Sequence, residues 1–224
     1  MNKTIVITCF NGNKENIIEK TKNKFNIVLY NKKNNDFGLP IKNIGVDAYD
    51  KLHYIVNNYD NLTNIVLFTT DSMYNMGPKK SRKIDYILEN INKLENNSGF
   101  LTEHIYKMKT EIEYNFTIDI YKNKKLNKSP DRPFYNWFKK YINNDLNADN
   151  IFYCKKSCFA VSKDLILNNP KIYYIKLLNY IERNCIHGEF DEIPHYFERA
   201  WVEIFTKNNI KNIYYNTKKY GELI

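Results

Sequence analysis

The stretch DAYDKLHYIVNNYDNLTNIVLFTTD (residues 47–71) places a helix pattern directly before the pattern of a buried strand. Ala48, Leu52, Ile55 and Tyr59 recur at the spacing of one face of an α-helix. The run that follows is rich in β-branched and aromatic residues and ends at Asp71. A helix that leads into an almost wholly apolar strand is typical of a βαβ unit, in which the strand is covered on both faces.

The residues before this stretch repeat the alternation. KTIVITCF (3–10) and NIVLYNK (26–32) have the composition of short strands, and KENIIEKTKNKF (14–25) between them has helical spacing. NNDFGLPIKNIGV (34–46) is expected to be a loop. Strands joined by short crossover helices predict an α/β fold with a Rossmann-type, mostly parallel sheet flanked by helices.

The second half of the chain is less regular. Its patterns predict helices at 81–94, 134–142 and 169–184, a strand-like segment at 111–122, and a strand pair or one long bent strand at 150–163. No change in composition marks a boundary, so residues 1–224 are expected to form a single domain.

A last helix begins near Pro194, a residue that suits the first turn of a helix. Its spacing predicts one broad apolar face made by Phe197, Ala200, Trp201, Ile204 and Phe205, with Tyr196, Arg199 and Glu203 opposite, facing water. Glu198 falls at the border of the apolar face and His195 lies one turn earlier on the same flank. A carboxylate that loses part of its hydration is suited to general-base work. The alternative is a glutamate paired with a nearby Lys or Arg, beside a histidine with no chemical role.

Composition excludes several classes of protein. Hydrophobic residues make up 43% and aromatic residues 15% of the 224 residues, which excludes a disordered chain. No apolar run approaches the ~20 residues of a membrane span, and MNKTIVITCF (1–10) is expected to be a strand and not a signal peptide. A cytoplasmic protein is therefore expected. The net charge is +9, but the lysines are scattered, which favours a solvated surface or an anionic ligand over nucleic acid.

Two clusters of metal-ligand residue types lack the usual spacing of a metal site. Cys154, Cys158, Cys185 and His187 do not follow a standard zinc pattern, and all four cysteines, Cys9 included, are expected to be reduced thiols. HGEFDEIPH (187–195) gathers His187, Glu189, Asp191, Glu192 and His195 without the helical H-E-x-x-H spacing. A solvated loop is favoured there over a metal-dependent hydrolase.

The carboxyl ends of the predicted strands are where an open α/β sheet binds its ligand. Those ends read CFNGN, YNKKN and TTDSM, and none is a glycine-rich dinucleotide motif or a P-loop. Asp71, directly after a buried strand, is placed to reach a metal ion or a donor diphosphate. The alternative is that Asp71 caps the turn that follows it.

Four stretches together resemble a family of bacterial, fungal and giant-virus proteins. They are YNK (30–32), NIGVDAYDKLHYIVNNYDNLTNIVLF (43–68), FYCKKSCFAVSKDLI (152–166) and HYFERAWVEIF (195–205). In that family they correspond to N-x-G-x-E with L-h-Y-I and N-Y-D-x-L, then F-x-V-S-x-x-x-I, then E-R-x-W-x-x-I-F. The family in turn resembles small GT-A-type glycosyltransferases, including ones encoded by large DNA viruses.

The resemblance implies a GT-A-like domain in which residues 1–75 bind the nucleotide and 76–224 carry the acceptor and catalytic groups. Asn11 and Asn31 would border the nucleotide. The N-x-G-x-acid loop would comprise Asn43, Gly45 and Asp47, with Val46 where related transferases often carry Arg.

The resemblance also implies a metal and a base. Asp71 would stand at the D-x-D motif and hold Mn²⁺ or Mg²⁺ with the donor diphosphate, although DSM (71–73) lacks the second acid. Glu198 would face the acceptor as general base, and His195 would either orient it or contact the acceptor.

The leading hypothesis is therefore a glycosyltransferase that uses a nucleotide-sugar donor and a hydroxyl acceptor on a glycan or protein, in the host cytoplasm if the protein is viral. The alternative is a non-catalytic basic α/β domain that binds nucleotide or nucleic acid.

Overall fold

The structure is a computed structural model of the chain, and it describes residues 2–33, 37–74, 78–109, 126–144, 150–155, 158–187, 190–207 and 209–220. The strand predicted at 111–122 lies outside these ranges, as does Glu189. Within the described ranges, no helix is long and apolar enough to cross a membrane.

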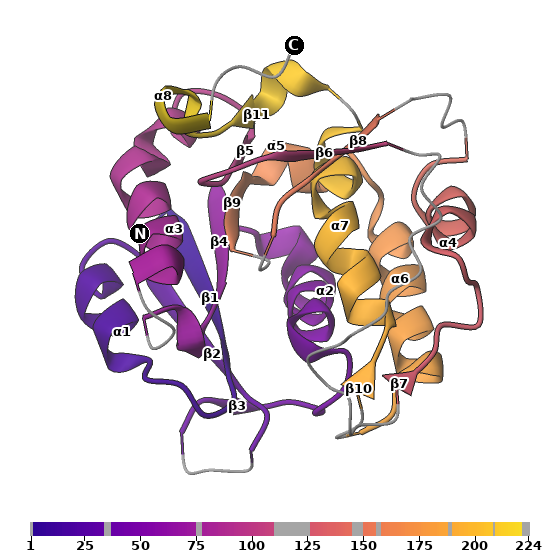
Figure 1. Cartoon of the computed structure of the whole chain (residues 1–224). Helices are drawn as coiled ribbons and strands as arrows, with labels where there is room; N and C mark the ends of the chain where they lie inside the picture. Colours follow the sequence, from indigo (N-terminus) through magenta and orange to yellow (C-terminus); the bar gives the residue numbers. More distant parts are fainter. Residues whose placement is uncertain are drawn as a thin grey trace.

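One mixed sheet of seven strands organises the fold (Figure 1). Its strands, in spatial order, are β11 (Ile213–Tyr214), β5 (Phe100–Leu101), β9 (Phe159–Ser162), β4 (Ile65–Thr70), β1 (Lys3–Cys9), β2 (Asn26–Asn31) and β3 (Leu39–Pro40). β1 pairs in parallel with both β2 and β4, and β9 is antiparallel to β4 and β5. The predicted mostly parallel sheet is thus confirmed, with β9 as its exception.

Helices cover both faces of this sheet (Figure 1). α1 (Glu15–Thr21) and α3 (Pro78–Asn90) lie on one face, and α2 (Val46–Asn58), α6 (Lys171–Asn184) and α7 (Ile193–Thr206) lie on the other. Successive strand residues point to opposite faces, so Val66 and Phe68 enter one core while Ile65 and Leu67 enter the other. This double burial explains the continuous apolar runs of β1 and β4.

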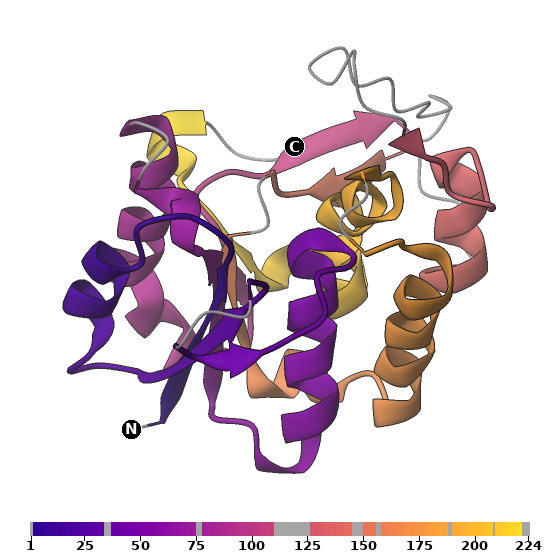
Figure 2. The ribbon, with the colours of Figure 1, turned by 90° about the horizontal axis from the view of Figure 1, so that it is seen from below.

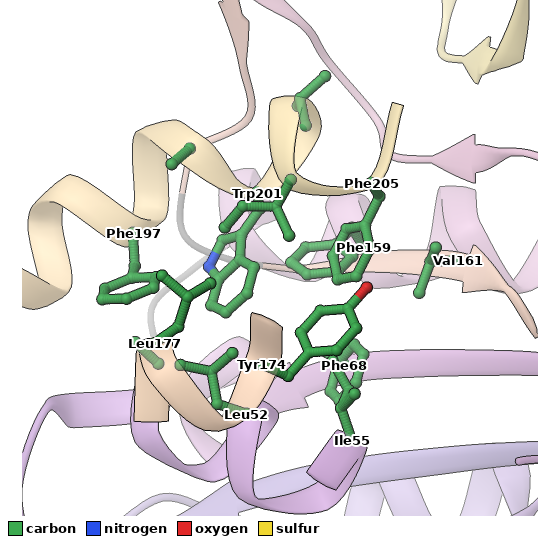
Figure 3. Close-up of a cluster of buried hydrophobic side chains, with 14 of the residues drawn as sticks. Leu52, Ile55, Phe68, Phe159, Val161, Tyr174, Leu177, Phe197, Trp201 and Phe205 are labelled. Carbon is green, nitrogen blue, oxygen red and sulfur yellow. The ribbon is translucent and has the colours of Figure 1, made fainter. Parts of the chain in front are cut away.

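The larger core lies between α2, α6, α7 and the sheet (Figure 3). Phe159 on β9 stacks on Phe100 with ring centroids 4.8 Å apart and also contacts Trp201 and Phe205 of α7. The apolar face predicted for the last helix is confirmed, since all five of its residues are buried: Phe197, Ala200, Trp201, Ile204 and Phe205.

The opposite face of α7 was expected to meet water, and for two residues this is wrong. Tyr196 is 0% exposed and Glu203 is 3% exposed. The reason is a further layer, because α4 (Phe134–Tyr141) packs against α7 on that side. The Tyr196 ring lies 5.3 Å from that of Phe134, and Glu203 Oε1 accepts a hydrogen bond of 2.8 Å from Asn143. Arg199 stays partly exposed.

Short elements of the second half depart from the sequence patterns. The segment 150–163, predicted as a strand pair or one long bent strand, is two strands that do not pair with each other. β8 (Asn150–Tyr153) pairs with β6 (Tyr106–Lys109) in a separate ribbon, and β9 joins the main sheet. Figure 2 shows this ribbon beside the helices, away from the main sheet. Further elements are β7 (Leu126–Asn127), paired with β10 (Phe190–Asp191), and two short helices, α5 (Lys163–Leu167) and α8 (Thr217–Tyr220).

Candidate functional site

Five buried charged side chains gather at the carboxyl edge of the main sheet. They lie at the start of α2, after β4, on α3 and after β5, and they are Asp47, Lys51, Asp71, Lys83 and Glu103, called the edge cluster below. Charged side chains are seldom buried unless they are paired, and an open α/β sheet binds its ligand at this edge. The edge cluster is therefore the candidate functional site.

Asp71 ties the end of β4 to the loop after β1. Its Oδ2 accepts hydrogen bonds from the backbone N–H groups of Phe10 and Gly12, each 2.7 Å long. A Cβ on Gly12 would lie 2.7 Å from Asp71 Cγ, so the close approach requires glycine. Asn11 lies between the two donors and is exposed. The structure thus brings the predicted residues Asn11 and Asp71 together.

The loop after β2 is held by Asn31. The Asn31 side-chain amide donates to the carbonyl of Phe37 at 2.9 Å, and its Oδ1 accepts from the Lys33 N–H at 2.8 Å. Beside this loop, Phe10 is 46% exposed, and Lys33 Nζ lies 5.3 Å from its ring centroid. An exposed aromatic ring next to a cation thus stands at the carboxyl edge of the sheet.

The loop before α2 has an unusual backbone. Gly45 has φ 59° and Val46 has φ 48°, both in the left-handed region. A β-branched residue with positive φ is a conformational outlier, a feature that clusters at functional sites. At Gly45 a Cβ would lie 2.5 Å from Ile181 Cγ2, so this position also requires glycine. Asn43 is half-buried in the same loop.

Two buried ion pairs anchor the start of α2. Asp47 pairs with Lys51 one turn later on the helix, and Lys32 Nζ lies 2.9 Å from Asp50 Oδ1. Burial raises the pKa of the Asp50 carboxyl to about 6, although the Lys32 ammonium acts in the opposite direction. Lys32 also donates to the carbonyl of Ile44 at 2.9 Å, which binds the loop before α2 to the end of β2.

Lys83, on α3, has a distant partner. Its Nζ lies 4.0 Å from Glu103 Oε2, while the other oxygen of that carboxylate accepts a hydrogen bond of 2.6 Å from Lys219. The Lys83 side chain is 9% exposed and donates no hydrogen bond to any part of the chain that the structure describes. Its ammonium group is thus buried without a close acceptor within that part.

Two buried thiols, Cys154 and Cys158, are influenced by the charges of the buried lysines. Burial raises the pKa of the Cys154 thiol to about 12, and the charges of Lys83, Glu198 and Lys51 also act on that thiol. Burial likewise raises the pKa of Cys158 to about 11, and Lys83 and Lys51 lower it in opposition. α2 and α3 lie on opposite faces of the sheet. All four cysteines are free thiols, as expected.

The predicted general base, Glu198, and the neighbouring His195 both lie on α7. Glu198 Oε2 is 3.9 Å from His195 Nδ1 and 3.5 Å from Arg199 Nη1, and all three side chains are partly exposed. Arg199 also donates to the His195 carbonyl at 2.7 Å. Burial is the main cause of the raised pKa of the Cys154 thiol, and the charge of Glu198 contributes to it.

The acids proposed for a hydrolase have structural partners. Glu192 is fully buried and accepts hydrogen bonds from the Ser129 N–H at 2.8 Å and from Arg132 Nε at 3.0 Å. Asp191 accepts a bond of 2.6 Å from Asn127. Throughout the ranges described above, no group of three or more His, Cys, Asp or Glu side chains is placed to hold a metal ion.

The Mn²⁺ or Mg²⁺ implied for Asp71 does not fit the residues around it. One carboxylate oxygen is occupied by two backbone N–H groups, and the second-acid position of D-x-D is Met73, which is buried in the core. Divalent cations of this kind require several oxygen ligands, which the neighbouring Ser72 and Met73 side chains do not supply as a set.

Three members of the edge cluster were missed from the sequence. Lys51 could have been found from the sequence, because it follows Asp47 at the i,i+4 spacing of a helical ion pair. Lys83 carries a weaker signal, since it shares a helix flank with Ile87 at the same spacing. No sequence pattern distinguishes Glu103, whose burial depends on the later strands β9 and β11.

Comparison with known proteins gives one result. No curated protein and no solved structure matches the chain. One family model matches residues 5–217, which includes every residue of the edge cluster as well as Glu198 and His195. The chain therefore belongs to the family described as "Protein of unknown function (DUF3431)".

Proposed function

We propose that the protein is a glycosyltransferase that moves a sugar from a nucleotide-sugar donor to a hydroxyl group of a glycan or protein acceptor. The observation that carries the proposal is the edge cluster, a set of buried acids and lysines at the carboxyl edge of a mostly parallel sheet. Buried charges at this place are costly to fold and are typical of a ligand site.

The sheet supports a GT-A-like arrangement. The first half of the chain builds a parallel βαβ series, and the second half adds the antiparallel strand β9 between β4 and β5. In this proposal residues 1–75 bind the nucleotide, and 76–224 hold the acceptor and the base.

The donor side would use the loops after β1 and β2. The exposed ring of Phe10 offers a surface on which a nucleotide base stacks, and the neighbouring Lys33 offers a positive charge to a phosphate. Asn11, Asn31, Asn43, Gly45 and Asp47 border the same edge and are the proposed nucleotide-binding residues.

The chemistry would take place beside Glu198. The oxygen of the acceptor hydroxyl attacks the anomeric carbon of the donor and forms the new C–O bond, and Glu198 takes the hydroxyl proton. The bond between the anomeric carbon and the phosphate oxygen breaks, and its electron pair leaves with the nucleoside diphosphate. His195, with Nδ1 3.9 Å from Glu198 Oε2, is the proposed orienting residue.

Differential scanning fluorimetry tests the proposal against a basic surface that binds polyanions. UDP-, GDP- or TDP-sugars are expected to raise the melting temperature more than single-stranded RNA of equal charge, because they bind only the native site. A polyanion-binding surface predicts the reverse, with binding that falls steeply as salt increases. Equal, salt-labile stabilisation by every anion would contradict the proposal.

A further inference from the structure

We infer that the diphosphate of the donor is met by the ammonium group of Lys83 and not by a divalent cation held at Asp71. The inference rests on the proposed function, since it concerns how the same site holds its nucleotide.

Asp71 is used as a structural acceptor. Its Oδ2 receives the N–H groups of Phe10 and Gly12, and the fit of Gly12 against Asp71 Cγ leaves no room for a Cβ at residue 12. A carboxylate that holds two backbone donors fixes the loop after β1. The buried Met73 stands where a second acid would be needed for a cation.

Lys83, unlike Asp71, lacks a close hydrogen-bond partner in the part of the chain that the structure describes. Its charge is buried, yet the nearest carboxylate is 4.0 Å away and is bonded more closely to Lys219, at 2.6 Å. A buried ammonium is costly unless hydrogen-bond acceptors surround it. A phosphate supplies such acceptors together with two or more negative charges, and lysine binds phosphate as a point charge.

The position of Lys83 suits a diphosphate. α3 is the helix that follows β4 and the turn at Asp71, so Lys83 projects from the next element after the strand end where the donor is proposed to bind. Lys51 lies on α2, on the other face of the sheet, and the Asp47 carboxylate already contacts its ammonium. Lys83 is therefore the lysine of the edge cluster whose ammonium group a phosphate would supply with hydrogen-bond acceptors and negative charge.

Isothermal titration calorimetry with UDP, GDP and TDP tests this inference in two buffers, one with excess EDTA and one with excess MnCl₂. The dissociation constant of the tightest of the three is expected to agree between the buffers within about twofold. Lys83→Met is expected to weaken that binding by about tenfold or more, because it removes a charge-assisted contact.

Two further variants control for charge and folding. Lys22→Met removes a lysine that is paired with Glu19 near the end of α1, at the amino edge of the sheet, and should leave the dissociation constant unchanged. Lys83→Arg retains the charge and should bind within a few-fold of the parent. The melting temperature of each variant reports whether it folds. If Lys83→Met does not fold, the comparison of the two buffers on the parent protein still decides.

Each outcome has a definite meaning. Binding that needs Mn²⁺ and is lost in EDTA would overturn the inference and leave the proposed function standing. A folded Lys83→Met variant that binds like the parent would also overturn it. If none of the three nucleotides binds in either buffer, both the inference and the proposed function fail.

Discussion

The carboxylate of Asp71 accepts a hydrogen bond of 2.7 Å from the backbone N–H of Gly12, and this contact joins the ends of two neighbouring parallel strands, β4 and β1. The bond from Phe10 to the same oxygen makes the junction rigid. The loop that carries Phe10 and Asn11 thus owes its position to one buried side chain.

Asp71→Ala is expected to destabilise the fold by about 2–4 kcal/mol, because it leaves two backbone donors without their charged acceptor. Asp71→Asn retains an acceptor and should cost less. Urea denaturation of both variants measures the effect. A free energy of unfolding for Asp71→Ala equal to that of the parent would contradict the structural role of this carboxylate.

Gly45→Ala tests the loop before α2. The left-handed φ of 59° and the 2.5 Å approach to Ile181 both oppose a side chain at this position. A loss of about 1–3 kcal/mol in the free energy of unfolding is expected from strain and overpacking. Gly38→Ala cannot serve as the control, because Gly38 also has a positive φ, of 70°, and an alanine there would be strained as well. A suitable control is Ser72→Ala, which should change stability by less.

The buried thiols predict how stability depends on alkaline pH. Burial is the main cause that raises the pKa values of Cys154 and Cys9 to about 12 and that of Cys158 to about 11, from the ordinary value of 9.0 for a thiol. Above about pH 9 the unfolded chain releases thiol protons that the folded chain retains. Below pH 9 these thiols should not change the free energy of unfolding with pH. As the pH rises from 9 toward 11, the free energy of unfolding should fall.

Urea titrations at pH 7, 9 and 10.5 measure this fall, and replacement of Cys154 and Cys158 by alanine should reduce its slope. A thiol reagent at about pH 8 should react with the native protein slowly and with the unfolded protein fast, because the thiolate is the reactive form. An unfolding midpoint that rises between pH 9 and 10.5 would contradict the assignment.

The centre of the sheet could be predicted from the sequence because β1 and β4 are buried on both faces. A strand such as β4 must be apolar along its whole length, and that run needs no knowledge of distant residues to be recognised. The direction of β9 could not be predicted in this way. It depends on where the chain returns to the sheet after the β6–β8 ribbon, which no local pattern encodes.

The two faces of α7 show a similar limit. Its apolar stripe predicted the face that meets Phe159, but the burial of Tyr196 depends on α4, a helix more than fifty residues earlier in the chain. Tyr196 is amphipathic, so its side chain fits either water or an aromatic cluster. Helical spacing therefore predicts which face of a helix packs on the main core better than it predicts whether the opposite face is also covered.

The burial of the lysines in the edge cluster could not be predicted from the local sequence either. Lys83 stands in the lysine-rich run PKKSRK (78–83), and composition alone marks such a run as solvated surface. Only the packing of α3 against β9, with Glu103 beside Lys83, separates this lysine from its neighbours.

Glu198→Gln is the change that tests the central claim most directly, measured as release of nucleoside diphosphate from UDP-, GDP- and TDP-sugars with water or an added saccharide as acceptor. The variant keeps the shape of the side chain but cannot accept a proton, and Glu19→Gln, on the exposed surface of α1, is the matched control. The account predicts release by the parent protein and by Glu19→Gln, and a rate about 10²–10⁴-fold lower for Glu198→Gln with unchanged donor affinity. A Glu198→Gln protein that releases nucleoside diphosphate as fast as the parent would contradict it.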